Sequence, residues 1–164
     1  MISLTVWQLG EEIMRKYLVA LGAVAMATIS SQAHAGAVAI CIEKSKNKAG
    51  NYFDSEYFLR HGKSPNVDGY IAVKAARQDH RESYKSSTPY CRHNGKSIAN
   101  GGYFVVIKDG RKKDHAGAHY NRWALGFGTT RAAAIADAKR ELWGRSATLM
   151  AKIHGYKIEE ENKI

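Results

Sequence analysis

An apolar segment near the N-terminus limits how much of this chain is available to fold. A short basic stretch, Met14-Arg15-Lys16, comes before an apolar run at 18–29, and Ala33-His34-Ala35 forms a small-x-small site after it. This order is typical of a secretory signal peptide that is removed after export. We therefore expect residues 1–35 to be a signal peptide, cleaved after Ala35.

Cleavage would leave a short and strongly basic chain. With Met14 as a candidate true start, residues 36–164 form the mature protein and suit one domain with a modest core. The signal segment has no net charge, so the formal net charge of +10 belongs to the mature part. We expect a periplasmic or secreted protein without stable membrane insertion. Its charge would attract an acidic protein or a polyanion of the envelope, nucleic acid included, but it would equally keep a small protein soluble.

Two cysteines remain in the mature part, Cys41 and Cys91. Because disulfides form in oxidising compartments, we expect these two residues to be bonded to each other. The alternatives are a buried free Cys41 within the apolar run 37–42, or pairing between molecules through Cys91. The cysteine spacing does not indicate a metal site, and we expect no cofactor.

Hydrophobic patterning predicts strands and two helices in the mature part. The first helix is expected between a cap at Ser64 or Asp68 and about Tyr84, and the second begins after Thr129 or Thr130 and bends or stops at Gly144. Strands are expected at 37–42, 51–60, 102–108, 122–128 and near 156–158, followed by a frayed acidic tail. We predict one small α+β domain with an antiparallel sheet and two helices packed on one face; the order of elements also fits a ββα-ββα pseudo-repeat.

Two short motifs resemble those of a family of small exported bacterial domains of unassigned function. Gly36-Ala37-Val38-Ala39 opens the mature part as the G-A-I-A strand does in that family, and Gly126-Phe127-Gly128-Thr129-Thr130 leads into an Ala-rich helix. The resemblance implies a fold and an envelope location, but no catalytic residues. The two glycines before a helix also fit an anion-binding turn, or simply close packing of strand against helix.

A basic segment with interleaved aromatic residues is the best candidate binding site. It follows the tight-turn signal Asp109-Gly110 and is therefore expected at the tip of a hairpin. Basic side chains can hold the backbone of a polyanion while aromatic rings stack on its units. The alternative is a solvated turn whose lysines protect an edge strand from aggregation. The candidate binding residues are Arg111, Lys112, Lys113, His119, Tyr120, Arg122 and Trp123.

The same segment contains the weak catalytic candidates Asp114, His115 and His119. Together with His93 they could supply general acid–base groups, with basic residues holding a scissile phosphate, as in a small nuclease. The two neighbouring histidines lack a persuasive third ligand, so we predict no metal site. An enzyme should bury one histidine in a pocket beside a carboxylate, whereas a binding protein should expose both beside a basic patch.

We therefore favour a non-catalytic binding module of the envelope that contacts an acidic or polyanionic partner, a class that includes inhibitor and immunity proteins. The alternative is a small secreted hydrolase, such as a nuclease, that uses the region of His115 and His119.

Overall fold

The computed structural model describes residues 36–63, 67–95 and 101–164, and the expected signal peptide lies outside these ranges. The described strands form two antiparallel sheets of three strands each. The first sheet consists of β1 (Gly36–Lys46), β2 (Tyr52–Lys63) and β3 (Tyr90–His93), and the second of β4 (Tyr103–Asp109), β5 (Trp123–Gly128) and β6 (Tyr156–Lys163). Two long helices, α2 (Gly69–Ser83) and α3 (Arg131–Trp143), follow β2 and β5.

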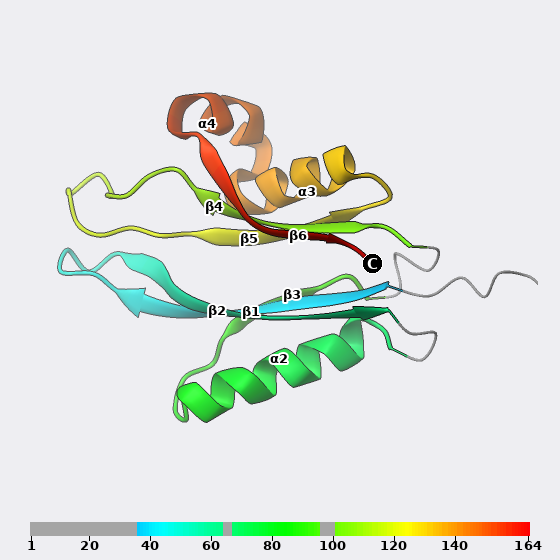
Figure 1. Ribbon diagram of the computed structural model, residues 1–164. Coiled ribbons are helices and arrows are strands. Elements are labelled where there is room, and N and C mark those ends of the chain that lie inside the picture. Colours follow the sequence, from blue (N-terminus) through cyan, green and yellow to red (C-terminus); the bar gives the residue numbers. More distant parts are fainter. Residues whose placement is uncertain (1–35, 64–66, 96–100) are drawn as a thin grey trace, which may run out of the picture. The chain divides into compact units, whose positions relative to one another are not determined.

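The two sheets pack face to face, and each has its own helix on the opposite face (Figure 1). Val38 and Ile40 of β1 share the central core with Phe104 and Val106 of β4. The α+β class of a small domain is thus confirmed. The arrangement differs in one respect, because the strands make two sheets rather than one, and the helices cover different sheets. Patterning along a strand reports which faces are buried, but not which sheet the strand joins.

Both halves of the domain have the same strand order. In the first half β1 lies between β2 and β3, in the second β4 lies between β5 and β6, and every neighbouring pair is antiparallel. In each half, the long helix connects the second strand with the third. The structure is therefore a ββαβ unit that occurs twice. The sequence predicts strand β6 near 156–158, whereas β3 lies in a segment for which no strand is predicted.

Side-chain caps fix the start of both long helices. Asp68 accepts hydrogen bonds from the backbone N–H groups of Tyr70 and Ile71, and Thr130 accepts one from Ala133. These residues are among the caps that the sequence predicts. Gly144, with a φ of 60°, ends α3, and a short 3-10 turn leads into α4 (Ala147–His154).

Two apolar residues of the helix after Gly144 lie outside the core. Leu149 and Ile153 of α4 are 58% and 61% exposed. Beyond α4, the acidic segment that we expected to fray continues as β6 up to Lys163, and the backbone of Ile164 exchanges two hydrogen bonds with Gly102. None of the described helices is long and apolar enough to cross a membrane.

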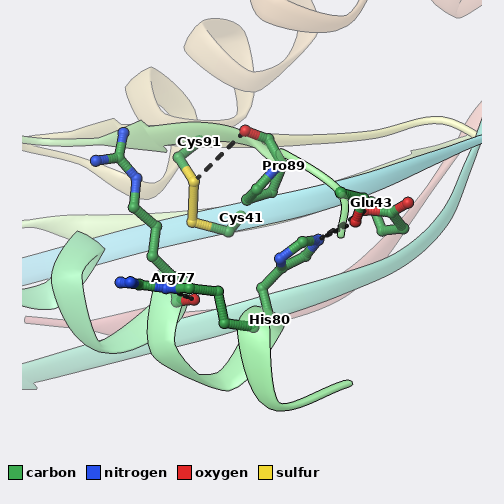
Figure 2. Close-up of a disulfide and its surroundings, with 8 residues drawn as sticks. Cys41, Glu43, Arg77, His80, Pro89 and Cys91 are labelled. Carbon is green, nitrogen blue, oxygen red and sulfur yellow. Dashed lines mark hydrogen bonds and ion pairs between the residues drawn. A yellow bond between two sulfur atoms is a disulfide. The ribbon is translucent and has the colours of Figure 1, made fainter. Parts of the chain in front are cut away.

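The predicted disulfide is confirmed: Cys41 of β1 and Cys91 of β3 are bonded and lie directly opposite each other, with their Cα atoms 4.1 Å apart. Figure 2 shows the bond beside Arg77 and His80 of helix α2. A disulfide of this kind is typical of proteins from oxidising compartments.

Candidate functional site: the paired hairpin tips

The turn between β1 and β2 is organised by one side chain. Asn47 Oδ1 accepts hydrogen bonds from the backbone N–H groups of Ala49 and Asn51, each at 3.0 Å, and Asn47 N donates to the carbonyl of Asn51. Gly50 takes a φ of 80°, which L-residues with a side chain rarely adopt. The Ala-Gly pair therefore lies in a tight loop whose backbone is hydrogen-bonded to the Asn47 side chain.

The long connection between β4 and β5 ends in a turn of the same design. Asp114 Oδ1 accepts from the backbone N–H groups of Ala116 and Ala118, each at 2.9 Å, and Asp114 N donates to the carbonyl of Ala118. Gly117 has a φ of 76°. Asp114 thus plays the role in the second half that Asn47 plays in the first, and an Ala-Gly pair follows each of them.

Asp114 also joins the two turns. Its Oδ2 atom accepts hydrogen bonds from the side-chain amides of Asn47 at 2.7 Å and Asn51 at 2.8 Å. The amide of Asn47 additionally donates to the carbonyl of His119 at 3.0 Å. The hydrogen bonds from Asn51 and Asn47, supported by the two backbone bonds, lower the pKa of Asp114 to about 2. We call residues 46–52 and 112–119 the paired tips.

The paired tips carry an excess of positive charge, because four lysines stand against one carboxylate. Within these two segments Asp114 is the only acidic residue, and both of its oxygens already accept hydrogen bonds. Tyr52 is 63% exposed, and the ammonium group of Lys46 lies 5.1 Å from the centre of its ring. The exposed basic and imidazole side chains of the paired tips are those of Lys46, Lys48, Lys112, Lys113, His115 and His119.

Two of the predicted binding residues, Arg111 and Tyr120, belong to a largely buried polar cluster outside the paired tips. Arg111 forks onto the carboxylate of Asp109, with N–O distances of 2.6 to 3.1 Å, and donates to the hydroxyl of Tyr120 at 2.9 Å. Trp143 at the end of α3 donates to the same carboxylate at 3.0 Å. Burial raises the pKa of Asp109, but the hydrogen bonds from Arg111 outweigh it and hold the pKa below its ordinary value. This arrangement ties the β4–β5 connection to α3.

Two others, Arg122 and Trp123, line a separate pocket of about 230 Å³. Its polar lining also includes Lys44, Asp54, Tyr90 and Glu141. Asp54 is 5% exposed, and its Oδ2 atom accepts a hydrogen bond from the backbone N–H of Trp123 at 2.8 Å. Burial raises the pKa of Asp54, although the Trp123 hydrogen bond and the charges of Lys44 and Arg122 oppose this effect.

The catalytic candidates are not gathered in a pocket. His115 is exposed, and His119 is exposed with its ring edge-on to Phe53, the ring centres 5.0 Å apart. The Nε2 atom of His119 lies 3.0 Å from the side-chain amide of Asn121, while Asp114 is occupied as described above. His93 lies in β3, where its Nδ1 accepts from the backbone of Gly95. Among the described residues no group of His, Cys, Asp or Glu side chains could hold a metal ion.

A different histidine is buried next to the disulfide (Figure 2). The Nε2 atom of His80 lies 2.6 Å from the carboxylate of Glu43, and Ser87 donates to the same carboxylate at 2.8 Å. The His80 side chain is 0% exposed, and its ring stacks on Tyr84. Ser87 Oγ also lies 3.4 Å from His80 Nε2, but its hydroxyl donates to Glu43 and the imidazole has no access to solvent, so this trio serves to join α2 to β1.

Sequence reasoning missed the first-half members of both sites. In the paired tips, 60 or more sequence positions separate Lys46, Lys48 and Tyr52 from the residues of the second tip. In the pocket, a similar separation lies between Lys44 or Asp54 and the pair Arg122 and Trp123. The available signal was the Ala-Gly pair that occurs at the same place in both halves. Comparisons with family models, curated proteins and solved structures found no match to this chain.

Proposed function

We propose that this protein is a non-catalytic binding module of the bacterial envelope that holds an acidic or polyanionic partner on its paired tips. The observation that carries the proposal is the cross-link at Asp114, which brings basic residues from both halves onto one surface while its own charge is fully hydrogen-bonded. Uncompensated positive charge on a surface attracts polyanions from solution.

The surroundings of the histidines favour binding over hydrolysis. Both His115 and His119 are exposed beside lysines, and no free carboxylate adjoins them among the described residues. The exposed ring of Tyr52 gives the surface an aromatic face next to Lys46. Alternation of cations and rings is the pattern by which proteins hold polyanionic chains without reading their sequence.

A location in the periplasm or outside the cell completes the proposal. The disulfide between Cys41 and Cys91 supports it, because such bonds persist in oxidising compartments. The predicted signal peptide supports it independently from the sequence. Acidic polymers and acidic exported proteins are the partners that this compartment offers.

The test uses charge reversal at the four lysines of the paired tips, Lys46→Glu, Lys48→Glu, Lys112→Glu and Lys113→Glu. Fluorescently labelled poly-L-glutamate serves as the probe, and its affinity is measured at increasing salt concentration. We expect the wild type to bind it with an affinity that falls steeply with salt, and the variant to lose both the affinity and most of the salt dependence.

A matched control removes the same net charge elsewhere. Lys63, Lys74, Lys152 and Lys163 are exposed and lie outside the paired tips, so their reversal to Glu should leave most of the binding intact. Equal losses in the two quadruple variants would show that net charge alone attracts the probe, and the proposed site would be wrong.

A further inference from the structure

The pocket beside the paired tips collects hydrogen-bond donors that the protein itself does not use. The Nε1–H of Trp123 is buried without a hydrogen-bond partner among the described residues. Within the described part of the chain neither the ammonium group of Lys44 nor the guanidinium of Arg122 has a hydrogen bond or an ion pair; the Lys44 ammonium lies 5.3 Å from the centre of the Tyr90 ring, and both charges act on Asp54. Three donors, two of them charged, are therefore available to a ligand.

The acidic side chains of the pocket differ in how far they are already satisfied. Glu141 accepts a hydrogen bond from the hydroxyl of Tyr90 and pairs with Arg92 at 3.3 Å, so its charge is compensated locally. Asp54 is buried, and within the described residues its carboxylate accepts one hydrogen bond, from the backbone of Trp123 at its Oδ2 atom. The pocket thus offers two free cations and one carboxylate with acceptor capacity left, which leaves a net charge of about one positive unit for a ligand to balance.

We propose that this pocket binds a small monoanionic hydroxycarboxylate, with a single uronic acid as the type of ligand. The ligand's carboxylate would accept from Lys44 and Arg122, and a hydroxyl would donate to Asp54 and accept from the Trp123 indole. The volume of about 230 Å³ is below the roughly 300–1,000 Å³ typical of sites for drug-sized molecules, which favours one sugar-sized unit.

The structure supplies its own reporter for this binding. In the full-length protein labelled with ¹⁵N, Trp123 lines the proposed site and its buried indole N–H has no partner among the described residues, whereas that of Trp143 donates to Asp109 and serves as an internal reference. Titration with D-glucuronate should shift the Trp123 signal in a saturable way, with a Kd on the order of 1 mM, and leave the Trp143 signal in place.

Three further probes define the chemistry. D-glucose lacks the carboxylate and acetate lacks the hydroxyls, so each should bind at least about tenfold more weakly than D-glucuronate. Inorganic phosphate carries charge without the sugar ring. If phosphate shifts the Trp123 signal as strongly as D-glucuronate, or if D-glucuronate does not shift it, the proposal is overturned.

Variants separate this site from the paired tips. Arg122→Gln should weaken D-glucuronate binding at least about tenfold, because it removes a charge-assisted hydrogen bond. Lys44→Gln provides the same test if the first variant does not fold. Lys63→Gln, at an exposed position at the end of β2 outside both sites, is the matched control that should bind normally. The quadruple tip variant should also keep the Trp123 shift. Failure of the poly-L-glutamate experiment would therefore leave this inference standing, and failure of the D-glucuronate titration would leave the proposed function standing.

Discussion

The two halves of the domain share one topology but hold their third strands in different ways. In the first half, β3 has only four residues, and Cys91 is bonded to Cys41 on the opening strand. In the second half, β6 has eight residues, and Ile158 pairs with Ile107 in an apolar cluster under α3. A short strand makes few ladder hydrogen bonds. The disulfide therefore holds β3 in its sheet, whereas the longer β6 is held by strand pairing and side-chain packing.

The largest expected effect comes from breaking that covalent bond. Replacing both Cys41 and Cys91 with Ala should lower the free energy of unfolding by about 4 kcal/mol, because the bond closes a loop with a sequence separation of 50. Denaturation with guanidinium chloride, monitored by tryptophan fluorescence, measures the loss.

The matched change in the second half is Ile107→Val with Ile158→Val. Each truncation removes one methylene group, and together they should lower the free energy of unfolding by about 2 kcal/mol. A smaller loss in the cysteine variant than in the isoleucine variant would mean that the disulfide does not compensate for the short β3.

The sequence was sufficient for most local features of the fold. Apolar runs, the caps at Asp68 and Thr130 and the break at Gly144 act over a few residues, and all of them predicted elements that the structure contains. The division into two sheets depends instead on which strands meet across the core. Each of the opening strands β1 and β4 is buried on both faces, and burial of both faces is equally compatible with one sheet covered on two sides.

The candidate site shows the same limit more strongly. The basic segment 111–113 is visible in the sequence, but the role of each member is set by distant partners. Arg111 and its neighbour Lys112 differ only in that Asp109 and Tyr120 hold the arginine, while the lysine remains exposed. The contribution of Lys46 and Lys48 depends on hydrogen bonds that join Asn47 to Asp114 across the two halves.

A second contrast between the halves lies where each long helix meets its opening strand. Ala72, Ala76 and His80 are buried at four-residue spacing in α2, and Ala134, Ala138 and Leu142 are buried at the same spacing in α3. His80 is thus the counterpart of Leu142, and it binds Glu43. The first half uses a buried polar contact where the second half uses a hydrocarbon side chain.

Replacing the buried histidine of the first half with the leucine of the second should destabilise the first half. His80→Leu leaves Glu43 buried without the imidazole, and the free energy of unfolding should fall by about 3 kcal/mol. Adding Glu43→Leu should recover much of this loss, because both polar partners are then replaced by apolar groups. Thermal unfolding of the single and double variants measures both effects, and a double variant less stable than His80→Leu would contradict the comparison.

A third contrast concerns how closely the helices approach the second strands. A Cβ atom on Gly126 of β5 would lie 2.1 Å from the carbonyl oxygen of Ala134, so α3 packs directly on the backbone there. In the first half Arg60 of β2 reaches Asp79 of α2 through two hydrogen bonds at the surface.

Gly126→Ala should therefore lower the free energy of unfolding by about 2 kcal/mol, because the helix must move away from the sheet. Arg60→Ala removes only a largely exposed ion pair and should change stability little. Chemical denaturation compares the two variants directly. If the arginine variant proves the less stable one, the close approach at Gly126 is not what fixes α3.

The smallest expected effect concerns the two turns of the paired tips, which differ in their central side chain. The pKa of Asp114 is lowered to about 2 from its ordinary 3.8, so the charged form favours the folded turn. The stabilisation is complete above about pH 4 and is lost as the pH falls toward 2.

Asn47→Asp gives the first turn the acid of the second and places two carboxylates side by side, because the amide of Asn47 lies 2.7 Å from Asp114. Like charges disfavour ionisation, so the Asp114 pKa should rise, and the tips should separate at neutral pH, where both carboxylates are ionised and the wild-type tips stay joined. An NMR titration of the Asp114 carboxyl carbon measures the shift, with Asn162→Asp on β6 as the control. An unchanged pKa of Asp114 in the Asn47→Asp variant would mean that Asn47 does not hold the two tips together.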